Sequence, residues 1–139
     1  DDFSEDPVAF YNKEYSDVEI SNDFIEHFFK NSEFKDDLKV YFELTNDDFS
    51  ETNRYVFVDF SKETSINFDS FDWDLIKDLY IANSRVRHLH IKVREDSFCW
   101  VLKNNMPFED MSIGFQCRID RVPDFYNVAF WNHFTNVYI

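Results

Sequence analysis

The sequence predicts an α+β domain in which N-terminal helices pack on a curved, mostly antiparallel sheet that ends in a C-terminal β-meander. Apolar residues recur with the period of a helix in two parts of the chain, and they alternate with the period of a strand in several others. With 139 residues, 44% of them hydrophobic and 20% aromatic, the chain has enough apolar surface to bury a core. No repeat, low-complexity tract or linker divides it, so we expect residues 1–139 to form a single domain.

Three helices are predicted in the first 80 residues. A short helix is expected over residues 8–15, and Ser21 is placed to cap a second one with Asp23 in its first turn. Ser70 is the expected cap of the third helix. Its apolar stripe would consist of Phe71, Leu75, Ile76 and Leu79.

Strands are predicted wherever apolar and polar residues alternate. Residues 39–44 and 55–60 show this pattern on either side of the polar segment 45–53, which predicts a pair of neighbouring strands. Four further strands are expected at residues 88–93, 98–102, 112–119 and 128–139. The short connections at 103–111 and 121–127 favour antiparallel neighbours, which together make the meander.

The negative charge is concentrated in one part of the chain. Residues 1–78 hold 22 Asp and Glu against 7 Lys and Arg, residues 79–139 hold 6 against 7, and the whole chain carries −14. Such a charge repels nucleic acid and anionic membranes and attracts a protein with a basic surface. We therefore expect a soluble protein with a basic partner and without direct contact to nucleic acid or membrane.

Composition excludes several classes of enzyme. Gly114 is the single glycine, whereas phosphate-cradling loops and nucleophile elbows need several small residues. We therefore expect no catalytic residues and no cofactor. Cys99 and Cys117 are too few for a disulfide scaffold, and two buried free thiols are favoured over a bridge. A cytoplasmic location is expected, although the chain begins at Asp1 and the sequence leaves open a removed signal peptide.

The candidate binding surface is a set of acidic side chains with aromatic residues among them. Spaced carboxylates can imitate the phosphates of nucleic acid, and aromatic side chains can anchor an interface. The alternative interpretation is that these acids are exposed to solvent or interact favourably with a helix dipole. The predicted partner-binding residues are Asp36, Asp37, Asp47, Asp48, Glu51, Asp69, Asp72 and Asp74, with Tyr41, Phe49 and Trp73.

Metal sites are disfavoured on two grounds. The segment 45–51 is rich in oxygen ligands, but it lacks the glycine and the spacing of a helix-loop-helix calcium site. His88 and His90 share one face of a predicted strand, yet Lys92 and Arg94 continue that face and oppose a bound cation. We expect no metal.

These observations favour an inhibitor, of the immunity-protein or nucleic-acid-mimic type, that occludes the cleft of a basic partner. The partner class is a nuclease or another nucleic-acid-binding protein. One alternative is a non-catalytic interaction module with an aromatic interface. Another is a ligand-binding or enzyme domain with a pocket between sheet and helices, in which Asp59, Tyr41 or His133 acts as acid or base. The oligomeric state is left open.

Overall fold

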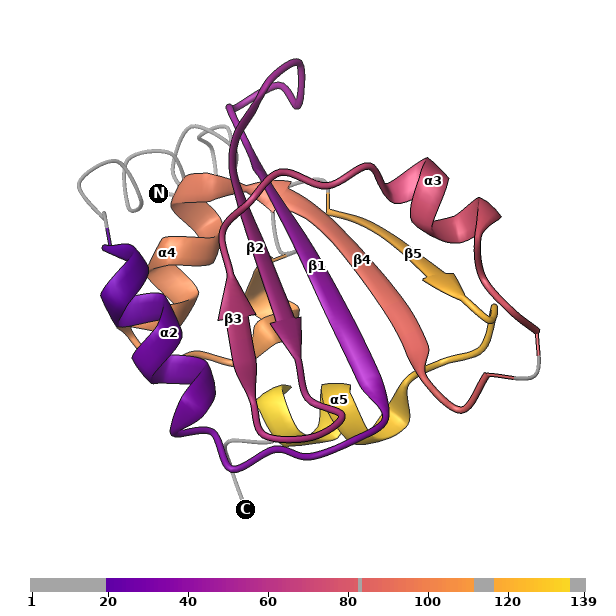
Figure 1. The fold of residues 1–139 in the computed structure, drawn as a ribbon. Helices are drawn as coiled ribbons and strands as arrows, with labels where there is room; N and C mark the ends of the chain where they lie inside the picture. Colours follow the sequence, from indigo (N-terminus) through magenta and orange to yellow (C-terminus); the bar gives the residue numbers. More distant parts are fainter. Residues whose placement is uncertain (1–19, 83, 112–116, 136–139) are drawn as a thin grey trace, which may run out of the picture.

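The computed structural model describes residues 20–82, 84–111 and 117–135. It contains an open five-stranded sheet with helices on both faces, so the α+β class is confirmed (Figure 1). The strands are β1 (Leu38–Thr45), β2 (Thr52–Asp59), β3 (Ser65–Asn67), β4 (Arg87–Arg94) and β5 (Arg118–Val122). The helices are α2 (Asn22–Lys30), α3 (Trp73–Asp78), α4 (Glu95–Lys103), the 3₁₀ helix η2 (Phe108–Met111) and α5 (Val128–Thr135).

The sheet is mixed, with the strand order β3-β2-β1-β4-β5. The expected pairing of residues 39–44 with 55–60 is confirmed, since β1 and β2 are antiparallel neighbours. The β2–β3 and β4–β5 pairs are also antiparallel, and only the central β1–β4 pair among these strands is parallel. That parallel pair needs a long crossover, which β2, β3 and α3 supply.

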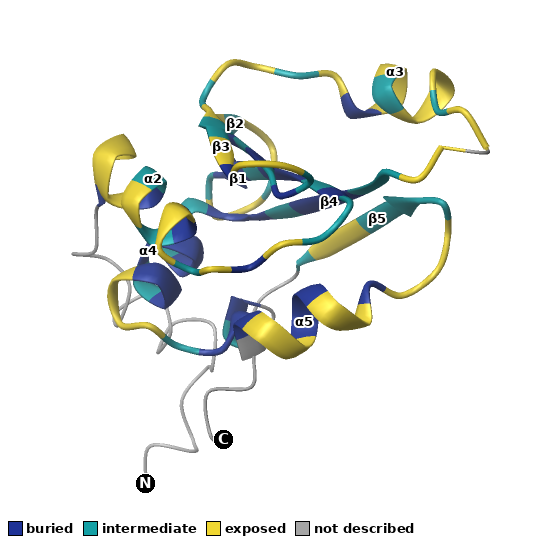
Figure 2. Cartoon of the chain, turned by 60° about the horizontal axis from the view of Figure 1, so that its bottom comes forward, coloured by how far each residue is buried: buried dark blue, intermediate teal, exposed yellow. Residues whose placement is uncertain are grey.

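The core lies on the face of the sheet that α2, α4 and α5 cover, and α3 lies on the opposite face (Figures 1 and 2). We call the face beneath α3 the outer face. Alternation along β1 turns Val40, Phe42 and Leu44 inward, where each is fully buried. Phenylalanine dominates this core, and its largest fully buried members are Phe29, Phe42, Phe60, Phe98, Phe108 and Phe130.

The start of α2 follows the sequence prediction, whereas the start of α3 does not. Ser21 caps α2, since its hydroxyl oxygen accepts a hydrogen bond from the Phe24 amide at 3.1 Å. The expected Ser70 cap of α3 is wrong, because the helix begins at Trp73 and Asp72 is its cap. The Asp72 carboxylate accepts from the Leu75 amide at 3.2 Å.

The predicted C-terminal β-meander is wrong, because two of its four strands are helices. The apolar run 98–102 lies inside α4, where Glu95 and Asp96 occupy the first turn and Lys103 the last, as the helix dipole favours. A short apolar run does not distinguish a buried helix from a buried strand by periodicity. Residues 128–135 form α5, in which Phe130, Trp131 and Phe134 are buried with helical spacing.

Several further expectations can be placed. The strand predicted at 88–93 is confirmed as β4, and β5 includes residues 118 and 119 of the segment 112–119. The helix predicted at 8–15, and residues 112–116 and 136–139, lie outside the described residues. Cys99 and Cys117 are free thiols, as expected, but only Cys99 is buried and Cys117 is half-buried. None of the described helices is long and apolar enough to span a membrane.

Candidate functional site

One row of outer-face side chains forms the anchor for α3. Strand register places His90 between Tyr41 on β1 and Asp120 on β5. Trp73, the first residue of α3, stacks on His90 with ring centroids 5.0 Å apart and contacts the Tyr41 ring at 5.5 Å. Its indole N–H donates to Asp120 Oδ2 at 3.0 Å, and Lys77 Nζ donates to the same oxygen at 2.8 Å. Asp120 therefore holds both turns of α3 against the sheet.

The neighbouring row is charged. Register places Lys92 between Glu43 on β1 and Arg118 on β5. A carboxylate oxygen accepts, so His90 Nε2 donates to Glu43 at 3.0 Å, and Lys92 Nζ lies 3.8 Å from the other carboxylate oxygen. The Arg118 guanidinium lies over the Phe49 ring, 5.8 Å from its centroid.

These rows and α3 border a cavity of about 650 Å³ on the outer face that is open to solvent. Carboxylates and aromatic rings line it, together with the two cations Lys92 and Arg118. This combination suits a ligand with a charged end and an apolar body. The lining residues are Glu43, Tyr55, Phe71, Asp72, Trp73, Asp74, His90, Lys92, Arg118, Ile119 and Asp120.

Burial favours the neutral form of the two histidines of this face, whereas Asp120 is held in its ionised form. Burial lowers the pKa of His90, although Glu43 opposes this shift. Burial, followed by the charge of Lys39, lowers the pKa of His88. For Asp120, burial opposes ionisation, but the hydrogen bonds from Lys77 and Trp73 prevail and hold its pKa at about 2. Within residues 20–82, 84–111 and 117–135, no group of three or more His, Cys, Asp or Glu could hold a metal ion.

Five of the predicted partner-binding residues lie in or beside this cavity. Asp72, Trp73 and Asp74 line it. Tyr41 is buried beneath Trp73, where its hydroxyl and His88 Nδ1 share a hydrogen bond of 2.9 Å. Phe49 contacts Arg118, which lines the cavity.

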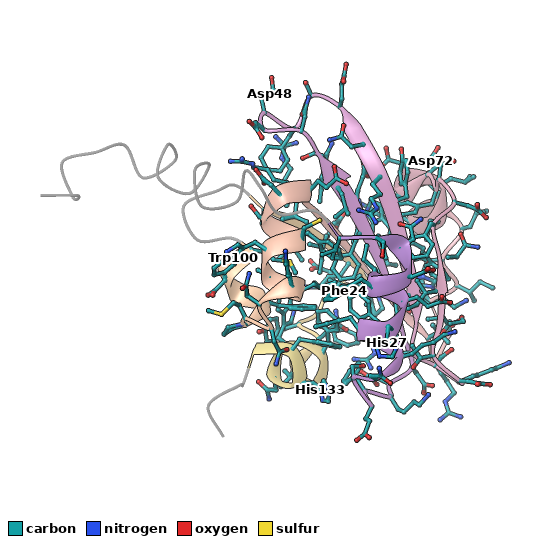
Figure 3. All side chains as sticks on the ribbon, turned by 90° about the vertical axis from the view of Figure 1, so that its left-hand side faces the viewer. Phe24, His27, Asp48, Asp72, Trp100 and His133 are labelled. Carbon is teal, nitrogen blue, oxygen red and sulfur yellow. The ribbon has the colours of Figure 1, made fainter. Side chains whose placement is uncertain are left out.

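The remaining predicted acids lie elsewhere, so the eight acidic residues do not form one surface. Asp36 and Asp37 precede β1 and lie within ion-pair distance of Arg87 and Arg85, respectively. Asp69 is exposed, three residues before the cap of α3. A third group, Asp47, Asp48 and Glu51, is in the β1–β2 turn, and Figure 3 shows Asp48 there, well apart from Asp72.

A second cavity, of about 470 Å³, lies between α2, η2 and α5 and is mainly lined by aromatic side chains. Figure 3 shows Phe24, His27 and His133 on this side of the molecule. His133 Nε2 donates to the Ser32 carbonyl at 2.7 Å, which gives this histidine a structural role. Asp59 accepts from the Ser61 amide at 2.8 Å. His133 lies on α5, which covers the core face of the sheet, whereas Tyr41 contacts Trp73 on the outer face.

Sequence reasoning missed two carboxylates that line the outer-face cavity. Glu43 and Asp120 receive hydrogen bonds from His90 and Trp73, respectively, but neither was a predicted site residue. The alternation of residues 39–44 and 88–93 does place Tyr41 with Glu43, and His90 with Lys92, on polar strand faces. The alternation identifies the two polar strand faces, but it does not show that the strands β1 and β4 pair with each other.

Comparisons with known proteins give a partial match. No protein family matches the chain, and no solved structure matches it. The chain is 48% identical over 44 residues to the cytidine monophosphate-N-acetylneuraminic acid hydroxylase of Sus scrofa, which is 32% of this chain and 10% of that protein. The hydroxylase of Macaca mulatta is 39% identical over 61 residues, 41% of this chain and 10% of that protein.

A human relative described as an inactive cytidine monophosphate-N-acetylneuraminic acid hydroxylase is also 39% identical over 61 residues, 12% of its length. The matched part thus spans about a tenth of the length of these curated relatives. The similarity is local to less than half of this chain.

Proposed function

We propose that this chain is a non-catalytic binding domain for a basic segment of another protein, with the outer-face cavity as its contact. One observation carries the proposal. The start of α3 and the two residues before it place the Asp72 and Asp74 carboxylates with Phe71 and Trp73 around a cavity that is open to solvent.

Lysine and arginine suit such a cavity because each has an apolar stem and a cationic end. The stem packs on aromatic rings while the end pairs with a carboxylate. The net charge of −14 adds long-range attraction and speeds the encounter with a basic partner. A domain that occupies the Lys and Arg of a nucleic-acid-processing protein would also inhibit it, because those side chains hold the phosphates. Inhibition of such a partner is therefore the first activity to assay.

The binding test uses calorimetry with an Arg-rich peptide and a Glu-rich peptide of equal length. The Arg-rich peptide is expected to bind at low salt and to lose affinity at about 0.5 M salt, where screening is nearly complete over a few ångströms. The double variant Asp72→Asn with Asp74→Asn keeps a cap on α3, because asparagine also caps helices. It should weaken binding about fivefold or more, since two rim charges are lost.

The matched control is Asp23→Asn with Glu26→Gln on α2, which removes the same charge from the opposite side of the molecule. Equal weakening in both variants would mean that net charge alone drives binding and would refute the cavity as the contact. If neither peptide binds wild-type protein, the proposed function fails.

A second candidate function follows from the partial match to the hydroxylases. Their name describes action on cytidine monophosphate-N-acetylneuraminic acid, an anionic sugar nucleotide. Lys92 and Arg118 give the same cavity two cations for a phosphate or carboxylate, and Tyr55 and Phe71 offer rings for a base. In this alternative the chain is the ligand-binding part of a longer, hydroxylase-like protein.

The two candidates predict opposite responses to charge. If the second candidate holds, cytidine monophosphate should bind wild-type protein. The double variant Lys92→Met with Arg118→Met should not bind it. Removal of Asp72 and Asp74 charges should then strengthen nucleotide binding, because two like charges leave the cavity. If calorimetry detects binding of the Arg-rich peptide but no heat of binding for the nucleotide, the second candidate is rejected.

A further inference from the structure

Exposed apolar side chains lie on α3 and just after its last residue, Asp78. Trp73 and Lys77, one turn apart, point to Asp120, so the opposite side of the helix faces solvent. Leu75 and Leu79, also one turn apart, are 54% and 69% exposed, and Ile81 just beyond is 73% exposed. We call these three residues the α3 stripe. Figure 2 shows that most of α3 is exposed, and exposed apolar side chains with charged residues beside them can mark a protein contact.

Carboxylates flank the α3 stripe. Asp74 and Asp78 are one turn apart, exposed and adjacent to Leu75 and Leu79 in sequence. The nearby cation Lys77 is engaged with Asp120. An apolar strip with acids beside it complements a surface that has an apolar strip with bases beside it.

We propose that the α3 stripe receives the apolar face of a basic amphipathic helix in the partner, whose Lys and Arg side chains contact Asp74 and Asp78. This inference rests on the proposed function and adds the shape and chemistry of the partner segment. An amphipathic helix presents apolar side chains one turn apart, and Leu75 and Leu79 have the same spacing on this chain. The cavity under α3 then takes one of the flanking cationic side chains.

Charge argues against two other occupants of the α3 stripe. A second copy of the chain would bring another net charge of −14 and another pair of acids to the same surface. An anionic membrane would be repelled by Asp74 and Asp78 in the same way. Neither a second copy nor an anionic membrane would supply a net positive charge to pair with Asp74 and Asp78.

The experiment compares two synthetic helical peptides of about 18 residues, or five turns. One has leucine along one face and lysine elsewhere, and the other has glutamine in place of every leucine, which keeps the charge and the helix propensity. We expect the leucine peptide to bind wild-type protein about tenfold more tightly in fluorescence anisotropy, because its apolar face is buried. Leu75→Gln with Leu79→Gln should abolish that difference, since glutamine keeps α3 helical but removes the stripe.

Two control variants make the result specific. Phe125→Gln with Val128→Gln removes exposed apolar side chains from another part of the surface and should leave the tenfold difference intact. Leu75→Met with Leu79→Met keeps an apolar stripe and should also preserve it.

Three outcomes would overturn the inference. Equal affinity of the two peptides for wild-type protein would refute the inference about the α3 stripe. It would not refute the proposed function, since a basic segment still binds. Binding of neither peptide would reject both. Self-association of the wild-type protein that Leu75→Gln with Leu79→Gln abolishes would assign the stripe to a second copy instead.

Discussion

The anchoring of α3 by Asp120 gives the sharpest test of the site's construction. Asp120→Asn removes the negative charge but keeps an amide oxygen that can accept from Trp73, whereas Asp120→Ala removes both. The two changes therefore separate the charge of Asp120 from its role as an acceptor.

The expected magnitudes follow from the exposure of the partners. The Asp120 side chain is 45% exposed, so solvent screens its interactions, and its ion pair with Lys77 adds little. A hydrogen bond to a charged acceptor contributes about 1.5–3 kcal/mol when it is shielded from solvent. Because Asp120 is partly exposed, we expect removal of its charge to cost about 1 kcal/mol. Asp120→Ala also leaves the indole N–H of the buried Trp73 without its acceptor, which raises the cost to about 2 kcal/mol.

The assay combines urea unfolding with amide hydrogen exchange. Because α3 is peripheral, its loss should appear mainly as faster exchange of the Ile76 and Leu79 amides, which donate within the helix. A cost of about 1 kcal/mol corresponds to roughly fivefold faster exchange in Asp120→Asn. Asp124→Asn, which breaks an exposed ion pair with Arg121, is the control and should leave α3 unchanged. Unchanged exchange in Asp120→Ala would refute the anchor.

The pH dependence has a defined sign. Hydrogen bonds from Lys77 and Trp73 hold the pKa of Asp120 at about 2, below the ordinary value of 3.8. Ionised Asp120 therefore stabilises the folded state above about pH 4, and this contribution is lost as the pH falls through 2. The stability difference between wild type and Asp120→Asn should shrink over that interval. A constant difference down to pH 2 would contradict the assigned pKa.

Three further predictions concern the core, the thiols and the phenol. Phe42→Ala, at a fully buried position, should lower the free energy of unfolding by about 3–5 kcal/mol in urea titrations, and Phe24→Ala, at a 40% exposed position, by far less; equal losses would contradict the assigned core. Burial raises the pKa of the buried Cys99 and of the half-buried Cys117 to about 11, so both should react slowly with iodoacetamide at pH 8 and faster in urea. Rapid native labelling would contradict these raised pKa values. Burial and, secondarily, Asp59 raise the pKa of Tyr41 to about 12, so absorbance at 295 nm should show a late-titrating tyrosine that is missing in Tyr41→Phe, and stability should fall as the pH rises from 10 to 12. Identical titration curves of folded wild type and Tyr41→Phe would exclude this environment.

Local features of the sequence determined much of the fold. Ser21 with Asp23 predicted the start of α2, and the alternation along residues 39–44, 55–60 and 88–93 predicted β1, β2 and β4. These signals succeed because capping and strand periodicity depend on residues close together in the chain. The concentration of acidic residues before position 79 was likewise visible from composition, and it underlies the proposed partner.

Tertiary structure alone decided which of these residues meet. The apolar run 98–102 suits a helix or a strand, and its position beside the core made it α4. The parallel pairing of β1 with β4 put Tyr41 beside His90, and the β4–β5 pairing put Asp120 within reach of Trp73, although 47 residues separate the members of that last pair. Periodicity states which face a side chain takes but not which strand lies next to it, because strand pairing depends on contacts distant in sequence.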